Sequence, residues 1–374
     1  MPADTTDIPP SPSPAKKKIG ITEEGWLTDC WYLAAMSNEL VAGKHLNREI
    51  LGQPVLLGRS GDGKAFALRD ICPHRLVPLS SGKQIDTDGT PTIECPYHGW
   101  RFGTNDGVCK HMPSLTPEDK TEPSRVKVRK YPLHEANGAV YIYVSHNPRF
   151  DGEPELAPPD FGQLPDAPSF VIVEDFNAHM DDAVVGLMDP AHVPFVHNQW
   201  WWRPPSSGFK IKQKPFEPRT RGWAIARHKP SGNSKLYSMV FGDEVTTEIV
   251  FQLPGMRWEV VENEKARFFT LTCLTPQQEK STRVTQITWI ENAPLLKLAS
   301  PIVKRMGRTF LLQDKEMVDL QNRGMKYQKA MLWIDDIDVQ AKWYQQLKRE
   351  WAASRTEKRD FTNPIQARTL SWRS

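Results

Sequence analysis

Residues 94–102 read ECPYHGWRF and set Cys95 and His98 three positions apart, among aromatic residues, a proline and a glycine. Upstream, the stretch ICPHRLVPLS supplies a second pair, Cys72 and His74. The chain holds only 5 cysteines, so matched C-x-H and C-x-x-H pairs indicate one shared set of metal ligands. Two thiolates and two imidazoles suit tetrahedral zinc, and they equally suit a [2Fe-2S] cluster with both cysteines on one iron and both histidines on the other. The spacing alone leaves both alternatives open.

The surroundings of the two pairs favour the cluster. Each cysteine is followed by a proline, and the second loop contains Gly99, so backbone amides can approach inorganic sulfides closely. The intervening QIDTDGTPT, residues 84–92, predicts a hairpin at the tip of the domain. This region resembles the Rieske iron–sulfur proteins. The resemblance implies that the cluster is held by Cys72, His74, Cys95 and His98.

Composition predicts a cytoplasmic globular protein of two domains. The chain has 374 residues, of which 39% are hydrophobic and 25% charged. Its 48 basic and 45 acidic residues are spread along the sequence, which argues against a nucleic-acid partner. We expect no membrane segment, because no apolar run is long enough and the N-terminus lacks the apolar core of a signal peptide. The few cysteines suit a reducing compartment without disulfides.

The sequence divides into a tail and two predicted domains. Residues 1–22 are rich in Pro, Ser and Lys and predict a disordered tail. Residues 23–150 contain short strand-like runs such as QPVLLGR and GAVYIYV, which predict a small all-β domain. A proline-rich joint, GEPELAPPDFGQLPDAP, then leads into the second domain, residues 151–374.

The second domain is predicted to be α+β. Residues 246–291 alternate strand-like runs with turns and predict an antiparallel sheet. Residues 299–326 and 335–352 follow a helical period and predict C-terminal helices.

A second metal site is predicted in VVGLMDPAHVPFVHNQWWW. Asp189, His192 and His197 are ionisable groups in an apolar stretch and require a compensating partner. A helix broken at Pro194 could turn both histidines toward one ion. The alternative interpretation is that both histidines are packed in the core without a metal. The Cys/His motif elsewhere in the chain makes this alternative less favoured. We interpret HMDD, residues 179–182, as helix surface.

A carboxylate is available in FLLQDKEMVDLQ. Non-haem Fe(II) that activates O₂ is held by two histidines and one carboxylate, with positions left open for oxygen. Asp314 falls on an apolar helical stripe, so its charge would be buried and in need of a cation. Glu316 and Asp319 are the competing acids, and their charged neighbours indicate exposure. The other members of the stripe are Phe310, Leu311, Met317 and Val318.

Together these features resemble the α subunits of Rieske non-haem iron oxygenases over roughly residues 25–350. The resemblance implies a Rieske domain followed by a helix-grip (START-like) catalytic domain, and an assembly of three chains arranged head to tail. In such a homotrimer His98 of one chain would face Asp189 of the next, and Asp189 would hydrogen-bond His192. One departure is Val185-Gly186, where many relatives carry an acid and Asn. The implied iron ligands are His192, His197 and Asp314.

The implied reaction uses O₂ and two electrons delivered through the cluster to hydroxylate carbon, and hydroxylation next to N or O leads to dealkylation. The chain has no GxGxxG fingerprint and no four-cysteine cluster motif, so a ferredoxin and an NAD(P)H-dependent reductase are expected partners. Four basic residues near the cluster loops are candidates for ferredoxin docking, with ordinary surface charge as the alternative. They are Arg75, Lys83, Arg101 and Lys110.

The substrate is predicted only as a small aromatic or apolar compound. Phe195 and Trp200, Trp201 and Trp202 flank the histidines and predict an aromatic pocket, although core packing explains them equally well. Within the family that the chain resembles, its size favours the homotrimeric branch, which includes vanillate- and dicamba-type demethylases and steroid hydroxylases. We therefore favour monooxygenation over ring cis-dihydroxylation. A Rieske electron-transfer protein without oxygenase activity and a structural zinc protein are the alternatives from other classes.

Overall fold

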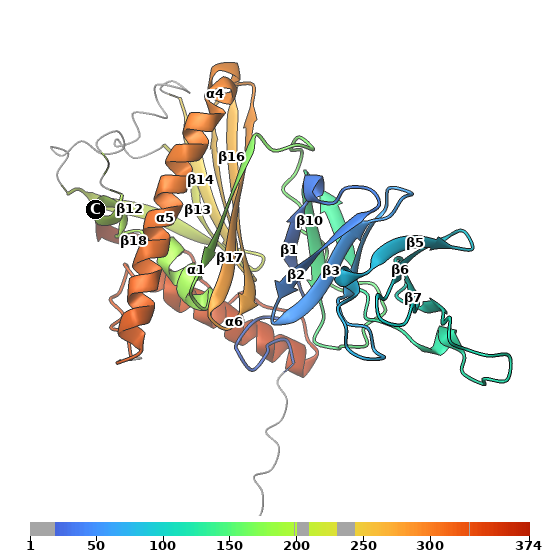
Figure 1. Cartoon of the computed structure of the whole chain (residues 1–374). Helices are drawn as coiled ribbons and strands as arrows, with labels where there is room; N and C mark the ends of the chain where they lie inside the picture. The colour runs from blue at the N-terminus through green and yellow to red at the C-terminus, as the bar shows by residue number, and fades with distance from the viewer. Residues whose placement is uncertain (1–18, 198, 200–208, 230–243, 329) are drawn as a thin grey trace, which may run out of the picture.

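The computed structural model describes residues 19–197, 199, 209–229, 244–328 and 330–374 (Figure 1). The predicted tail, residues 1–22, lies almost wholly outside these ranges. None of the helices in the described ranges has the length and hydropathy of a membrane-spanning segment.

The N-terminal part consists of three small antiparallel sheets, as the strand-like runs predict (Figure 1). The first sheet orders its strands β1 (Cys30–Met36), β10 (Ala139–Val144) and β9 (Leu133–Ala136), and the second β2 (Lys44–Ile50), β3 (Gln53–Arg59) and β4 (Ala65–Arg69). The third orders β5 (Lys83–Thr87), β6 (Thr90–Glu94), β7 (Arg101–Gly103) and β8 (Cys109–His111). Short 3₁₀ turns are η1 (Ser37–Glu39), η2 (Leu79–Ser81) and η3 (Pro123–Arg125). The predicted hairpin is formed by β5 and β6.

The C-terminal part contains one eight-stranded antiparallel sheet. Its strands lie in the order β11 (Phe170–Phe176), β17 (Ser281–Glu291), β16 (Arg267–Gln278), β15 (Met256–Glu262), β14 (Thr246–Gln252), β13 (Gly222–His228), β12 (Ile211–Arg219) and β18 (Arg368–Arg373). Strands β14 to β17 are the alternating runs that predict an antiparallel sheet. The edge strand β18 is not predicted by the sequence, and it comes from the far C-terminal end of the chain.

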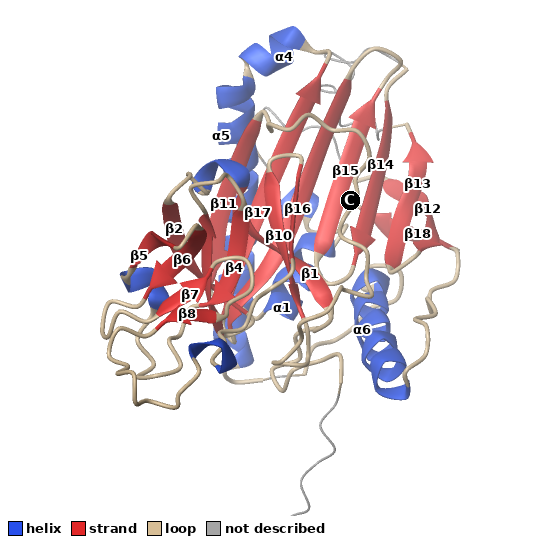
Figure 2. Cartoon of the chain, turned by 90° about the vertical axis from the view of Figure 1, so that its right-hand side faces the viewer, coloured by secondary structure: helices blue, strands red, loops and turns tan. Residues whose placement is uncertain are grey.

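Helices cover one face of this sheet, which confirms the α+β class (Figures 1 and 2). Helices α1 (Met180–Met188) and α5 (Ser300–Met325) lie on this face. The others are α2 (Val193–Val196), α4 (Pro294–Leu298) and α6 (Val339–Glu357), and α6 runs below the lower end of the sheet in Figure 1. Helices α5 and α6 are the two predicted C-terminal helices. Gly186 of α1 lets α5 approach closely, because a Cβ there would lie 2.8 Å from Cγ2 of Val318. Gly186 thus has a packing role at the contact between α1 and α5.

The N-terminal part packs on the opposite face of the sheet. Both views place β1 and β10 on one side and α1 and α5 on the other (Figures 1 and 2). Trp31 and Tyr141 share an apolar cluster with Phe269, Leu271 and other residues of the sheet. Because successive residues of a strand point to opposite faces, Thr270 and Thr272 are left facing the helices. The sheet is therefore a layer between the N-terminal part and helix α5.

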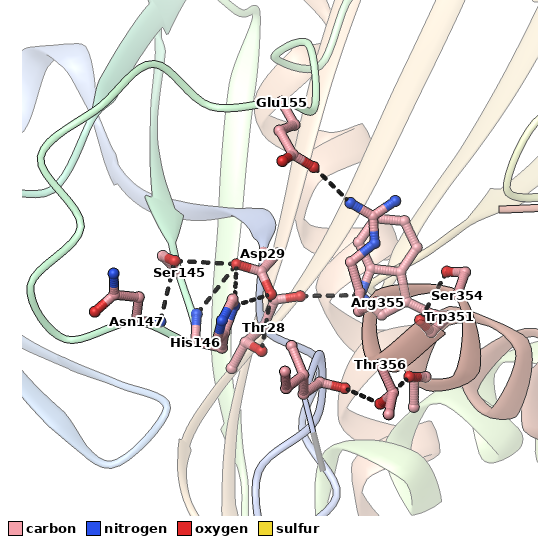
Figure 3. Close-up of polar contacts among 12 residues, drawn as sticks. Thr28, Asp29, Ser145, His146, Asn147, Glu155, Trp351, Ser354, Arg355 and Thr356 are labelled. Carbon is pink, nitrogen blue, oxygen red and sulfur yellow. Dashed lines mark hydrogen bonds and ion pairs between the residues drawn. The ribbon is translucent and has the colours of Figure 1, made fainter. Parts of the chain in front are cut away.

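Polar contacts join the start of β1 to the end of β10 and to helix α6 (Figure 3). Asp29, 5% exposed, accepts hydrogen bonds from the Ser145 hydroxyl at 3.0 Å and the His146 backbone N–H at 3.1 Å, and His146 Nδ1 lies 2.8 Å from its Oδ2. The indole N–H of Trp351 donates to the Thr28 carbonyl at 2.9 Å. The start of β1 is therefore held between the end of β10 and helix α6.

A buried ion pair corrects the interpretation of residues 179–182 as helix surface. The ammonium group of Lys348, a residue that is 5% exposed, lies 2.5 Å from both carboxylate oxygens of Asp181. The Tyr344 hydroxyl donates to the same carboxylate at 2.8 Å. Asp181 therefore joins α1 to α6. A sequence pattern on α1 alone cannot reveal a partner that lies on a later helix.

Candidate metal centres and the cavity between helix and sheet

The two cysteine loops have the same backbone hydrogen bonds. In the first loop the Cys72 N–H donates to the Val77 carbonyl at 2.9 Å, and in the second the Cys95 N–H donates to the Trp100 carbonyl at 2.8 Å. In each loop the cysteine begins a proline-containing turn and its amide is bonded to the residue five positions later. The two predicted ligand loops are therefore two copies of one turn.

A second bond closes each turn and requires an uncommon backbone conformation. Leu76 and Gly99 donate their N–H groups to the carbonyls of Cys72 and Cys95, at 2.9 and 3.0 Å. Both have positive φ, 60° at Leu76 and 69° at Gly99. A non-glycine residue adopts this region at a cost, so Leu76 indicates that the surrounding loop imposes the turn.

The side chains of the loops form an unsymmetrical set of possible ligands. Cys72 and Cys95 are each 2% exposed, whereas the rings of His74 and His98 lie nearer the surface with centroids 4.5 Å apart. Burial raises the pKa of the Cys72 thiol to about 11. Trp100 stacks on His74 at 4.6 Å and holds its ring. Buried sulfur ligands below two outer imidazoles fit a cluster with one iron on each ligand type.

The predicted iron ligands also lie together. His192 and His197 flank the short helix α2, and Asp314 lies on α5. The Nε2 atoms of the two histidines are 3.3 Å apart, and Asp314 Oδ1 is 3.3 Å from the first and 3.2 Å from the second. We call these three residues the triad. Ligand atoms held about 2.1 Å from one metal ion lie about 3.0–3.4 Å from one another, so the triad fits a metal ion without rearrangement.

The chain turns at a different point from the predicted one. Pro194 does not break a helix, because it occupies the first turn of α2. Helix α1 ends at Met188, and Asp189 caps its C-terminus. Residues between α1 and α2 carry the change of direction, and proline in a first helical turn needs no N–H partner.

Mutual attraction dominates the electrostatics among the three side chains of the triad. Burial alone would lower the pKa of His192, but the hydrogen bond and charge of Asp314, with the charge of Asp189, raise it. Burial would raise the pKa of Asp314, but its contacts with both histidines hold it below its usual value. A bound cation would replace the protons that these contacts share.

Gln313 is a site residue that the sequence did not indicate. Its Oε1 lies 3.0 Å from Nδ1 of His197, which is 7% exposed. Because an amide oxygen only accepts, the contact places the imidazole proton on Nδ1 and leaves the Nε2 lone pair for a metal. Gln313 precedes Asp314 on α5, but a polar residue on a charged helix carries no signal of this contact.

Asp189 lies beside the triad without the implied hydrogen bond to His192. Its Oδ2 is 3.9 Å from Nδ1 of His192, which is too long for a hydrogen bond. Its Oδ1 instead accepts from the Ala191 N–H at 2.7 Å. The described residues supply no hydrogen-bond partner for the buried Nδ1 of His192.

Several other residues of the two sequence motifs that contain the triad do not contact it. The side chain of Asp319 accepts a hydrogen bond from Asn177, and Glu316 is exposed. Met317 is 41% exposed and does not belong to the buried stripe. Phe195 is 67% exposed and stacks on Phe209 outside the cavity wall, which contradicts its assignment to an aromatic pocket. Trp200, Trp201 and Trp202 lie outside the described residues.

A cavity of about 1060 Å³ lies between the helices and the sheet and reaches the triad. His192, His197 and Asp314 are all part of its wall. The helix side is mainly apolar, with Met306 and Phe310 among its residues. A substrate-sized, mostly apolar space with a few polar groups is typical of a small-molecule site.

Three of the four basic candidates for ferredoxin docking have partners within the chain. Lys83 and Arg101 both pair with Glu94, at 3.2 and 2.9 Å, and Lys110 pairs with Asp106 at 2.7 Å. Arg75 is exposed and has no ion-pair partner among the described residues.

Comparison with known proteins agrees with this arrangement of two sites. Residues 30–132 match the Rieske [2Fe-2S] domain, and residues 176–354 match the vanillate O-demethylase oxygenase C-terminal domain. The first range holds both cysteine loops and the second holds the triad. The ranges lie within the predicted domains 23–150 and 151–374. The chain therefore belongs to the Rieske non-haem iron oxygenases. Within them, its second domain is of the vanillate O-demethylase type.

Individual relatives are similar over part of the chain. The oxygenase component of dicamba O-demethylase from Stenotrophomonas maltophilia is 36% identical over 180 residues, 46% of this chain and 48% of that protein. The oxygenase component of chloroacetanilide N-alkylformylase from Rhizorhabdus wittichii is 33% identical over 182 residues, 46% of this chain and 47% of that protein. The chain thus spans about half the length of these curated relatives. The crystal structure of dicamba monooxygenase bound to dicamba shares the fold, with a TM-score of 0.62 at 24% identity over 87% of this chain and 98% of that one.

Proposed function

We propose that this chain is the terminal oxygenase component of a multicomponent Rieske system. It would use O₂ and electrons from NAD(P)H to monooxygenate a small aromatic or apolar compound, by hydroxylation or oxidative N/O-dealkylation. The observation that carries the proposal is the triad on the wall of a substrate-sized cavity, in a chain that also has two cysteine–histidine loops. Two histidines and one carboxylate leave coordination positions open for O₂.

The roles of the residues follow from this assignment. His192, His197 and Asp314 would hold Fe(II), which when bound supplies the centre where O₂ is activated beside the substrate. Gln313 orients the His197 ring through Nδ1. The α5 and sheet walls hold the substrate and keep water from it. Cys72, His74, Cys95 and His98 would hold the [2Fe-2S] cluster that passes electrons singly.

The sheet between the two sites supports electron transfer from one chain to another. In a single chain the cysteine loops belong to the N-terminal part, whereas the triad lies on the helix side of the sheet (Figures 1 and 2). We propose a homotrimer in which His98 of one chain faces Asp189 of the next. Asp189 is suited to this because its side chain is 33% exposed and adjoins His192.

The remaining partners are those that would supply electrons to the chain. Electrons would come from an NAD(P)H-dependent reductase through a ferredoxin, for which Arg75 is the basic docking residue without an internal partner in the described ranges. We place the system in the cytoplasm, where these reductants are available.

The alternatives are ring cis-dihydroxylation and electron transfer without oxygenase chemistry. The names of two relatives, a demethylase and an N-alkylformylase, favour removal of groups attached to O or N. A direct test incubates the holoprotein, a ferredoxin and its reductase with methoxybenzenes and N-methylanilines under ¹⁸O₂. One labelled oxygen, in a phenolic product or a released aldehyde, supports monooxygenation. A cis-diol with two labelled oxygens would overturn it, and O₂-independent cluster turnover alone would favour an electron carrier.

A further inference from the structure

The cavity has an apolar rim at α4 and the first turn of α5. Leu295 and Leu298 of α4 are 82% and 80% exposed, and Ile302 of α5 is 65% exposed. Leu295 and Ile302 also line the cavity, and Leu298 lies one helical turn after Leu295. Side chains that are largely exposed and also belong to a cavity wall lie where the cavity meets solvent. We call Leu295, Leu298 and Ile302 the collar, because they stand at the mouth of the cavity.

Regular backbone structure holds the collar in place. Leu296 of α4 packs against the apolar cluster that contains Val261 of β15. The Ala299 N–H donates to the Leu295 carbonyl at 3.0 Å, and the Ala299 carbonyl accepts the Ile302 N–H at 2.9 Å, so α5 begins where α4 ends. The inner side of α4 is thus packed on the sheet, and the collar is left on its outer side.

The collar lies in a positively charged segment. Residues 293–313 contain four basic and no acidic residues. One of these, Arg308, pairs with Glu174 at 2.7 Å. The other three are exposed and have no ion-pair partner among the described residues; they are Lys297, Lys304 and Arg305. The neighbouring turn between β15 and β16 adds one exposed acid and one exposed base, Glu264 and Lys265, which offset each other.

Exposed aliphatic side chains beside unpaired cations fit the surface of an anionic membrane. The aliphatic side chains enter the boundary between headgroups and acyl chains, while lysine and arginine reach the phosphates. An acidic ferredoxin fits this place less well, because it must reach the cysteine loops, which belong to the N-terminal part on the far side of the sheet (Figures 1 and 2). A second copy of the chain seated on the collar would cover the cavity mouth.

We propose that the collar and its three unpaired basic residues dock this chain on the surface of an anionic membrane, with the cavity mouth toward the lipid. The contact lies in the headgroup region and needs no membrane-spanning helix. An apolar substrate partitions into the bilayer, so the cavity opens toward the phase in which that substrate is concentrated. The docking stands on the collar itself, and its use for substrate uptake rests on the proposed function.

The test is cosedimentation of the holoprotein with sucrose-loaded vesicles. One set of vesicles is phosphatidylcholine, and the other is phosphatidylcholine and phosphatidylglycerol in equal parts. Wild type is expected to partition at least about tenfold more strongly onto the anionic vesicles, since each basic residue near such a surface contributes to the attraction. Added salt should reduce this preference, because it screens the charges.

The aliphatic contribution is tested with the double variant Leu295→Ser, Leu298→Ser. Its partitioning onto the anionic vesicles should fall at least about tenfold, because two leucines no longer enter the acyl boundary. Leu332→Ser is the matched control, since Leu332 is 86% exposed and lies outside the cavity wall. This control should partition like wild type.

The basic contribution is tested with Arg305→Gln, which should reduce the preference for anionic vesicles about fivefold. Arg349→Gln is the matched control, because Arg349 is exposed on α6, at the other end of the sheet from α4 (Figure 1). It should keep the full preference. The visible absorption of the cluster checks the folding of every variant.

Three results would overturn the docking face: no binding to either set of vesicles, equal binding to both sets in wild type, or unchanged binding after the two leucines are replaced. Loss of the oligomeric state in the double variant, measured by size exclusion with light scattering, would also overturn it and assign the collar to a contact between copies. Turnover does not enter the test. Failure to bind vesicles therefore leaves the oxygenase proposal standing, and vesicle binding by a chain that oxygenates nothing leaves the docking face standing.

Discussion

The amide oxygen of Gln313 lies 3.0 Å from Nδ1 of the triad residue His197. Gln313 directly precedes Asp314, the carboxylate of the same triad, in the sequence. Helix α5 thus supplies both a possible metal ligand and the group that orients a second ligand. A hydrogen bond of this kind fixes the imidazole tautomer and the ring plane before metal arrives.

Gln313→Leu should weaken Fe(II) binding about 10- to 100-fold, because the His197 ring loses its acceptor and can rotate. Gln313→Glu retains an acceptor at the same position and should keep most of the affinity. The measurement is Fe(II) competition with a chromophoric chelator, with the cluster absorption as a check on folding. Equal Fe(II) affinity in Gln313→Leu and wild type would show that packing alone holds His197.

Gly99→Ala should destabilise the second cysteine loop by about 1–2 kcal/mol, since an alanine must adopt positive φ there. The new Cβ would also lie 3.0 Å from Cγ of Pro113. The measurement is the temperature at which the cluster absorption is lost. Gly61→Ala is the control, because that glycine has open space around it and no positive φ. A similar shift for both variants would contradict the role of the turn.

Asp181→Asn should lower stability by about 3–5 kcal/mol, because it removes the carboxylate that directly contacts the buried ammonium group of Lys348. Asp335→Asn removes an exposed partner of Lys342 and should cost less than about 1 kcal/mol. Thermal midpoints of the two variants, measured side by side, provide the comparison. If Asp181→Asn unfolds no earlier than Asp335→Asn, the ion pair does not hold α1 to α6.

Arg75→Glu should slow reduction by ferredoxin about tenfold or more at low salt, through repulsion of an acidic partner, and the difference should shrink as salt is added. Reduction by dithionite should be unchanged. Lys64→Glu, on an exposed turn with its side chain 82% accessible, is the control for net charge. Equal slowing by both variants, or an equal effect on dithionite, would remove Arg75 from the docking surface.

Local patterns in the sequence predict the parts of this structure that depend on local spacing. Alternation within residues 246–291 predicts strands β14 to β17, and the helical period of residues 299–326 predicts α5. The triad could also be predicted, because buried charge in an apolar stretch requires a partner. In contrast, β18 pairs with β12 from a distant part of the chain, so its own short sequence contains no sign of the contact.

The same limit applies to individual side chains. Gln313 lies on a helix whose polar residues are mostly solvated, and only the packing of α5 beside the triad distinguishes it. The ion pair of Asp181 is hidden for the same reason. Phe195 shows the opposite error, since an aromatic residue beside a site motif is exposed in the structure.

The central claim is that one chain holds both a Rieske cluster and a separate iron. Iron and acid-labile sulfide per chain, with an EPR spectrum of the dithionite-reduced protein, test it directly in wild type and His192→Ala. The account predicts about three irons and two sulfides in wild type, falling to about two irons in His192→Ala with the Rieske signal intact. About two irons in both proteins after anaerobic Fe(II) reconstitution would contradict it and leave an electron-transfer protein.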